Sequence, residues 1–389
     1  MIGFNFRGLG RFLRRSFFEH RGKNYRLTAK RLGVLLLSLA VYIPVEIMVW
    51  IGLGLDRLFY PGFKQVRVRA PIFIIGNPRS GTTFLHRLLS RDEGHFASMT
   101  TWEILLAPAV STRRFIRAAA GLIRLLGVPI RRLIRQWERD WQENNTVHKI
   151  RLRGPEEDEY LWVHTFSTLK IWSFAAMLEE AEPYVYYDQR MDPAQKTRMM
   201  DFYHRCLQRH LFSGSTEDEI YLAKNPNFSP MVRTLLERYP DARFIYLVRD
   251  PLQAVPSHLS LKEKEWKLLG SPLEPYAARE FILEESEHWY TYPLAELDKL
   301  PDHQAVILEF EKLTGNARAA VREIYQRFDL ELSEDFDRVL REETRKARQH
   351  ESEHVYCLEE MGLTASQLKD RFGAVYRRFD FQRGAAGEK

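Results

Sequence analysis

The chain has 389 residues, 45% of them hydrophobic and 28% charged, which is long enough to bury a large core and too apolar for a disordered protein. Residues 1–31 form a basic arm, which contains nine of the 58 Lys and Arg residues and one of the 52 Asp and Glu residues. The rest of the chain therefore has 49 basic and 51 acidic residues. A near-neutral body argues against nucleic acid as a partner, and two cysteines without metal-ligand spacing argue against a disulfide framework or a catalytic metal.

An apolar segment follows the basic arm. Residues 32–55 contain one charged side chain, Glu46, and would extend roughly 36 Å as a helix, enough to cross a bilayer. Pro44 would interrupt that helix, and a carboxylate near its middle is costly in a membrane. The segment is too long, and too far from the N-terminus, for a signal peptide. We predict a membrane-associated segment over residues 32–58, either a single span or a hairpin that turns back at Pro44, and we favour the hairpin. A buried soluble helix is the alternative.

The next element combines a strand, a glycine-rich loop and a helix. Residues 72–75 are apolar, as in a central strand of a parallel sheet, and Thr82 begins a helix with one apolar face. Loop amides and a helix N-terminus converge at such a turn and attract a phosphate. The spacing of Gly76 and Gly81 is that of a Walker A loop, but Thr82 replaces the lysine that nucleoside triphosphates need. Arg79 instead offers a planar donor for one phosphate or sulfuryl group.

Two strand–helix units follow in the second half of the chain. One predicted strand ends at Lys224, and a second ends just before Arg249, with Ser257 in the helix that follows. Consecutive units of this kind imply a parallel sheet with right-handed crossovers, whose ligands bind at the carboxyl ends of the strands. Both cations are therefore expected beside the glycine-rich loop.

These motifs resemble those of sulfotransferases that use 3′-phosphoadenosine-5′-phosphosulfate (PAPS), in the form found in tyrosylprotein sulfotransferases and many bacterial relatives. Arg249 with Ser257 resembles the pair that holds the 3′-phosphate, and Lys224 resembles the lysine that faces the phosphosulfate bridge. The resemblance covers about residues 70–380 and implies PAPS as donor, adenosine-3′,5′-bisphosphate as product and no required metal. The 5′-phosphosulfate loop is matched by Pro78, Arg79, Ser80, Gly81, Thr82 and Thr83.

The resemblance also implies catalytic roles. Glu103 lies at a similar distance past the loop helix to the general base of tyrosylprotein sulfotransferases, and a helix N-terminal glutamate favoured by the helix dipole is the alternative interpretation. Lys224 and Arg79 would stabilise the charge that passes to the leaving phosphate. Many bacterial relatives have a histidine where this chain has Phe228, so Glu103 is the expected base. Residues 155–159 resemble an acidic segment near the acceptor cleft, but an acidic run is by itself typical of a solvated helix start.

The sequence thus predicts an α/β fold with a P-loop-like central parallel sheet flanked by helices and an N-terminal membrane-associated helical segment. Its expected parts are a basic arm over residues 1–31, the apolar segment, and a sulfotransferase domain over residues 70–380 with a helical insertion at about 104–215.

The expected function is transfer of the sulfuryl group of PAPS to a hydroxyl-bearing acceptor. The basic amphipathic residues 113–135 and the apolar segment favour membrane lipids as partners and a lipid, glycolipid or glycan as acceptor. The basic arm and a cytosolic supply of PAPS favour a cytoplasmic catalytic domain. The alternatives are a P-loop kinase or NTPase and a non-catalytic membrane-bound nucleotide-binding protein.

Overall fold

A computed structural model describes residues 3–127, 151–214, 219–348 and 356–381, together with Arg132, Gln136, Glu138 and Arg139. Its strands are β1 (Ile72–Gly76), β2 (Phe96–Ala97), β3 (Ile220–Lys224), β4 (Arg243–Val248) and β5 (Ala305–Glu309). Its 3-10 helices are η1 (Pro61–Gln65), η2 (Asp158–Thr165), η3 (Pro226–Met231) and η4 (Glu359–Met361). The α-helices of the first half are α1 (Phe6–Phe17), α2 (Ala29–Phe59), α3 (Thr82–Leu89), α4 (Thr101–Leu105), α5 (Val110–Leu125), α7 (Leu169–Phe174), α8 (Leu178–Val185), α9 (Tyr187–Arg190) and α10 (Pro193–Phe212). Those of the second half are α11 (Val232–Arg238), α12 (Pro251–Leu269), α13 (Arg279–Leu297), α14 (Phe310–Gly315), α15 (Ala317–Arg327), α16 (Glu334–Arg348), α17 (Ala365–Arg371) and α18 (Gly373–Arg378).

The sheet has the strand order β2-β3-β1-β4-β5, and all of its pairs are parallel. Ile72 pairs with Leu222 on one side and with Arg243 on the other, so β1 lies at the centre. The chain leaves β1 for the β3 side and later crosses to β4 on the opposite side. This reversal brings the carboxyl ends of β1, β3 and β4 together, which is where ligands bind in such sheets.

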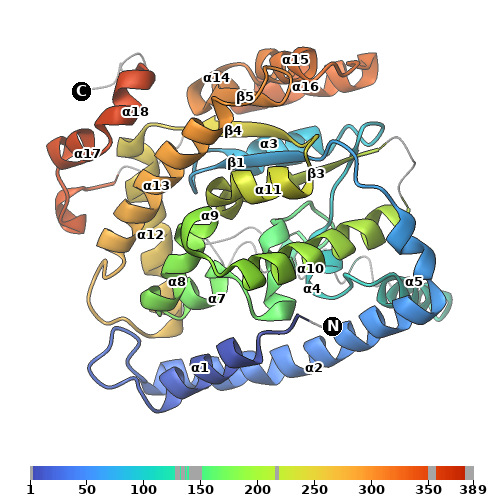
Figure 1. Ribbon diagram of the computed structural model, residues 1–389, viewed down its shortest axis with the longest axis horizontal. Helices are drawn as coiled ribbons and strands as arrows, with labels where there is room; N and C mark the ends of the chain where they lie inside the picture. The colour runs from blue at the N-terminus through green and yellow to red at the C-terminus, as the bar shows by residue number, and fades with distance from the viewer. Residues whose placement is uncertain are drawn as a thin grey trace.

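Both faces of the sheet are covered by helices (Figure 1). Ile72 and Ile74 point into a core formed with α3, α15 and α16, whereas Phe73 and Ile75 point into a larger core formed with α10 to α13. Alternate residues of one strand thus enter two cores, which explains why the whole strand is apolar. The predicted central parallel sheet flanked by helices is confirmed.

The apolar segment forms one continuous helix, α2, which extends from Ala29 to Phe59 through Pro44. The predicted hairpin at Pro44 is wrong, because contacts with the body hold both halves of the helix in line. The Arg31 guanidinium donates to Ser271 Oγ and to the carbonyl oxygen of Ala175, each at 2.7 Å. Past the proline, the carboxylate of Glu46 lies 2.8 Å from Nδ1 of the buried His164. These contacts outweigh the backbone hydrogen bond that a proline removes.

The C-terminal end of α2 also organises the helix beside it. Asp56 is fully buried, and its carboxylate accepts hydrogen bonds from the amides of Val110 and Ser111 at the start of α5. The same carboxylate pairs with Arg209 of α10 at 2.8 Å. Since α5 has no side-chain cap of its own, Asp56 supplies the acceptor that its first turn needs.

The described residues of the basic arm, 3–31, are part of the fold rather than a free tail. Its helix α1 lies beside α2 along one edge of the molecule (Figure 1). Arg11 pairs with Glu180 at 2.6 Å, and Arg15 pairs with Glu179 at 3.0 Å, which ties α1 to α8. Of the predicted basic stretch 113–135, α5 contains the first part, and most of the rest lies outside the described residues.

We expect the substitution Asp56→Ala to lower the free energy of unfolding by about 3–5 kcal/mol, because it leaves Arg209 as an uncompensated buried charge and uncaps α5. Urea denaturation followed by circular dichroism measures this loss. The control is Asp302→Ala, whose side chain is 97% exposed and which should change stability by less than about 0.5 kcal/mol. Equal stabilities of the two variants would contradict the role given to Asp56.

Candidate active site

The loop between β1 and α3 needs glycine at both of its ends. Gly76 has a φ of 144°, and a Cβ there would lie 2.4 Å from the carbonyl oxygen of Leu247. Gly81 has a φ of 86°, and a Cβ there would lie 2.7 Å from the ring of Phe310. The two glycines therefore let the loop close tightly over β4 and α14 while its backbone stays open to an anion.

The predicted donor-binding residues Arg79, Ser257 and Arg249 come together in the structure. Nε of Arg79 donates to Ser257 Oγ at 2.9 Å, and Nη1 of Arg249 donates to the carbonyl oxygen of Arg79 at 2.8 Å. The hydroxyl of Tyr356 lies 3.1 Å from Ser257 Oγ. Two guanidinium groups and two hydroxyls thus converge beside the loop, and this donor set fits a phosphate group.

Packing orients the guanidinium group of Arg249. It lies 4.2 Å above the ring of Phe310, the same ring that packs on Gly81. Burial lowers the pKa of Arg249, and Arg79 lowers it further, while Glu311 acts in the opposite direction. An anion bound between the two arginines would relieve their mutual repulsion, which favours binding of a doubly charged phosphate.

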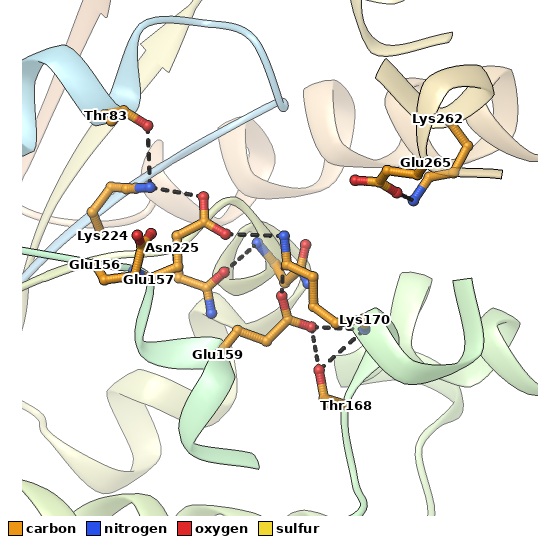
Figure 2. A network of polar contacts seen from close by, with 11 residues as sticks. Thr83, Glu156, Glu157, Glu159, Thr168, Lys170, Lys224, Asn225, Lys262 and Glu265 are labelled. Atoms are coloured by element: carbon orange, nitrogen blue, oxygen red, sulfur yellow. Dashed lines mark hydrogen bonds and ion pairs between the residues drawn. The ribbon is translucent and has the colours of Figure 1, made fainter. Parts of the chain in front are cut away.

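Lys224 lies at the end of β3 with 1% of its surface exposed. Its ammonium group donates to Thr83 Oγ1 at 3.2 Å and to Oε1 of Glu157 at 2.7 Å (Figure 2). One contact reaches the predicted donor loop and the other reaches the acidic segment. Lys224 therefore connects the donor side of the site with a carboxylate.

The acidic segment is buried, so the solvated helix start predicted from composition is wrong for it. Glu157 is 8% exposed and Glu159 is 1% exposed. The second oxygen of Glu157 pairs with Lys170 at 3.0 Å, while Glu159 accepts from Thr168 (Figure 2). Two lysines thus compensate the charge of Glu157, and this compensation offsets the desolvation cost of burying the segment.

The neighbouring Asp158 fixes this segment to the sheet. Its Oδ2 accepts hydrogen bonds from the hydroxyls of Tyr203 on α10 and Tyr221 on β3, at 2.7 and 2.8 Å. Burial raises the pKa of Asp158 to about 7, although both tyrosine hydrogen bonds act against that shift. The segment is therefore held rigidly beside Lys224.

Glu103 lies in a different polar cluster. One oxygen accepts from the amide and the hydroxyl of Thr100, which makes a capping box at the start of α4. The other lies 3.6 Å from both Arg113 and Arg117. Burial alone would raise the pKa of Glu103, but Arg113 and the hydrogen bonds from Thr100 lower it below its ordinary value. Thr100 and the two arginines therefore hold Glu103 as an anion within the cap of α4.

Phe228, which replaces the histidine of many bacterial relatives, is fully buried. It packs against the rings of Phe73, Trp162 and Tyr203 at centroid distances of 5.5–5.6 Å. The position thus serves the core in this chain. Among the residues that the structure describes, His, Cys, Asp and Glu side chains form no group of three arranged to hold a metal ion.

Glu157, Lys170 and Tyr356 lie beside the candidate site, although the sequence pointed to Glu157 only as part of the acidic segment 155–159. The acidic run was the one usable signal for Glu157, since four consecutive acids beside a core helix are costly unless cations compensate them. Nothing local marked Lys170. Tyr356 follows Ser257 by 99 residues, and only the folded chain brings the two together.

Comparisons with known proteins agree with the predicted resemblance. Residues 71–334 match the sequence profile described as the Sulfotransferase family. Two curated relatives, from Mycobacterium bovis and Mycobacterium tuberculosis, are each named omega-hydroxy-beta-dihydromenaquinone-9 sulfotransferase Stf3. Each is 25% identical over 334 residues, which cover 80% of this chain and 76% of the relative.

Solved structures of two mycobacterial sulfotransferases share the fold. The sulfotransferase STF9 from Mycobacterium avium superposes with a TM-score of 0.66 at 21% identity, over 85% of this chain and 81% of that one. STF1 from Mycobacterium tuberculosis superposes with a TM-score of 0.65 at 20% identity, over 95% of this chain and 91% of that one.

The cluster around Ser257 predicts selective binding of a nucleotide with a 3′-phosphate. We expect adenosine-3′,5′-bisphosphate to bind more tightly than 5′-AMP, and Arg249→Ala to weaken the bisphosphate about 10- to 100-fold while leaving 5′-AMP nearly unchanged. Isothermal titration calorimetry measures both. Arg327→Ala, on α15, is the control and should bind like the wild type. A similar loss for both nucleotides would contradict a 3′-phosphate site at Arg249.

Proposed function

The chain belongs to the sulfotransferase family, and from that premise we propose that it transfers the sulfuryl group of PAPS to a hydroxyl group of a membrane lipid. The observation that carries this proposal is the position of Lys224. Its buried ammonium group contacts both the loop that would hold the phosphosulfate and the carboxylate of Glu157. A cation between a phosphosulfate and a carboxylate suits a reaction in which negative charge moves to phosphate while a hydroxyl loses its proton.

The donor would lie along the edge formed by β1, β3 and β4. Arg249 and Ser257 would hold the 3′-phosphate, and residues 78–83, Arg79 among them, would hold the 5′-phosphosulfate with the N-terminus of α3. The acceptor oxygen forms a bond to sulfur, and the bond from sulfur to the bridging phosphate oxygen breaks. The electron pair of that bond leaves with adenosine-3′,5′-bisphosphate, where Lys224 would offset its charge.

We propose that Glu157, rather than Glu103, accepts the proton of the attacking hydroxyl. Glu157 contacts Lys224 directly, whereas the described contacts of Glu103 are with Thr100, Arg113, Arg117 and His210. A base must lie within hydrogen-bond reach of the reacting oxygen, and the carboxylate beside Lys224 meets that geometric condition best. Glu103 then has a structural role at the start of α4.

The acceptor class follows from a relative and from the surface of the chain. The curated mycobacterial relatives are named for a hydroxylated menaquinone, which is a membrane lipid with an alcohol group. The present chain carries a long exposed apolar surface on α2. A kinase or NTPase fits less well, because Thr82 occupies the position of the Walker A lysine.

The outward face of α2 supports membrane association. Its inward face is buried at positions that include Leu35, Val49 and Leu53, and the helix is long and apolar enough to cross a membrane by length and composition. The outward side chains are large, apolar and at least 38% exposed: Leu32, Leu36, Leu37, Val41, Ile43, Ile47, Ile51, Leu55, Leu58 and Phe59.

We propose that α2 lies in the surface of one leaflet, parallel to the membrane plane. Arg31, Glu46 and Asp56 bind the body along one face of the helix, and a crossing would take these charges into the bilayer. The arm before α2 is tied to α8 by Arg11, so arm and body share one side. The positive charge of the arm then favours the cytoplasmic side.

The assignment of the base predicts opposite outcomes for two conservative substitutions. We expect Glu157→Gln to lower kcat about 100- to 10,000-fold, with binding of adenosine-3′,5′-bisphosphate unchanged, because the amide cannot take a proton. Transfer of labelled sulfate from PAPS to a terminally hydroxylated menaquinone measures kcat. The matched control is Glu103→Gln, for which we expect a lower unfolding temperature and kcat within about threefold of the wild type. The reverse pattern would restore Glu103 as the base.

The proposed membrane association predicts that polar substitutions on the outward face of α2 weaken binding of the protein to lipid vesicles. We expect the triple variant Leu36→Gln, Ile43→Gln, Ile47→Gln to bind phosphatidylcholine vesicles about 100-fold more weakly, because three apolar side chains no longer enter the leaflet. Co-sedimentation measures binding, and an unchanged unfolding temperature shows that the fold survives. Binding equal to that of the wild type would contradict contact between this face and lipid.

A further inference from the structure

A pocket of about 410 Å³ opens between α2, η1 and α10. Its walls combine apolar groups, among them Trp50 and Phe202, with five basic side chains and one acid, Asp201. It shares no lining residue with the loop, Lys224 or the Arg249 cluster. The proposed sulfuryl transfer therefore does not use it.

The pocket has a net positive charge that the described part of the chain does not compensate. Arg209 is neutralised by Asp56, and Asp201 pairs with Arg238 outside the pocket at 3.3 Å. The remaining four basic side chains form no ion pair with the residues that the structure describes. They are Arg57, Lys64, Arg198 and Arg205, and all four are exposed at the rim.

The position of the pocket relates it to the apolar face of α2. At about 100° per residue, Trp50 and Arg57 lie on the flank of α2 between its buried face and its outward face. The rim is therefore at the level where the apolar surface ends and polar surface begins. The indole N–H of Trp50 is buried and donates to no described acceptor. Tryptophan with arginine and lysine at this level is typical of the headgroup region of a bilayer.

We propose that this pocket binds the phosphate headgroup of an anionic phospholipid whose acyl chains lie in the leaflet beside α2. Four uncompensated cations suit a phosphate diester, and the apolar walls suit the start of the acyl chains. The inference rests on the membrane location proposed above and is independent of the sulfuryl transfer. Headgroup binding would add selectivity for anionic membranes to the apolar attachment through α2.

The experiment compares binding of the full chain to vesicles of phosphatidylcholine alone and of phosphatidylcholine mixed with phosphatidylglycerol, at physiological salt. We expect the wild type to prefer the anionic vesicles. The triple variant Arg57→Gln, Arg198→Gln, Arg205→Gln should lose about fivefold in this preference per charge, or about 100-fold in all. Its binding to phosphatidylcholine and its transfer activity on a detergent-dispersed acceptor should remain.

The matched control removes three exposed basic residues from α15 and α16, at the opposite edge of the molecule (Figure 1), by Arg327→Gln, Arg338→Gln and Lys346→Gln. It should keep the preference for anionic vesicles. An equal loss in both variants would show a general charge effect and overturn the pocket. If soluble glycerol phosphate displaced the wild type from the anionic vesicles, the ligand of the pocket would be a free anion rather than a membrane phospholipid, and the proposal would be overturned. Failure of the wild type to bind either vesicle would overturn the membrane location itself, whereas the activity assay tests sulfuryl transfer separately.

Discussion

The ammonium group of Lys224 lies at the end of a central strand, where almost no water reaches it. A buried charge of this kind persists only beside an anion, and here the anion is Glu157. Glu157 in turn needs the segment around it to be fixed, which the two tyrosine hydrogen bonds to Asp158 achieve. One buried cation thus determines how the helical insertion meets the sheet and where a carboxylate faces the donor loop.

The geometry around the glycine-rich loop was predictable because the signals for it are local. Glycines at the ends of a loop, a strand before it and a helix after it are short-range features, and the parallel sheet then brings Arg249 and Ser257 to the same edge. The position of Glu157 beside Lys224 was not predictable in this way. Glu103 and Glu157 are both acids near helix starts in sequence, and only the partners Thr100 and Lys224 distinguish a cap from a group in the site.

The apolar segment shows how tertiary contacts override local preference. Pro44 and Glu46 both argue against a straight helix when the segment is considered alone. In the folded chain Glu46 meets His164, and Tyr42 donates to the carbonyl oxygen of Val163 at 2.9 Å. The charge that would be costly in lipid is thus an inward contact with the body, and this pairing could not be read from the segment itself.

The carboxylate of Asp56 has a practical consequence for how this protein can be handled. Deleting the N-terminal residues through α2, a common way to make a soluble fragment of a protein with an apolar N-terminal helix, would remove the partner of Arg209, the cap of α5 and the neighbour of His164. It would also uncover Ala109 and Thr112, which lie against Gly52. A truncated chain would therefore lose part of its own interior, and solubility is better sought by redesigning the outward side chains of α2 than by cutting the helix away.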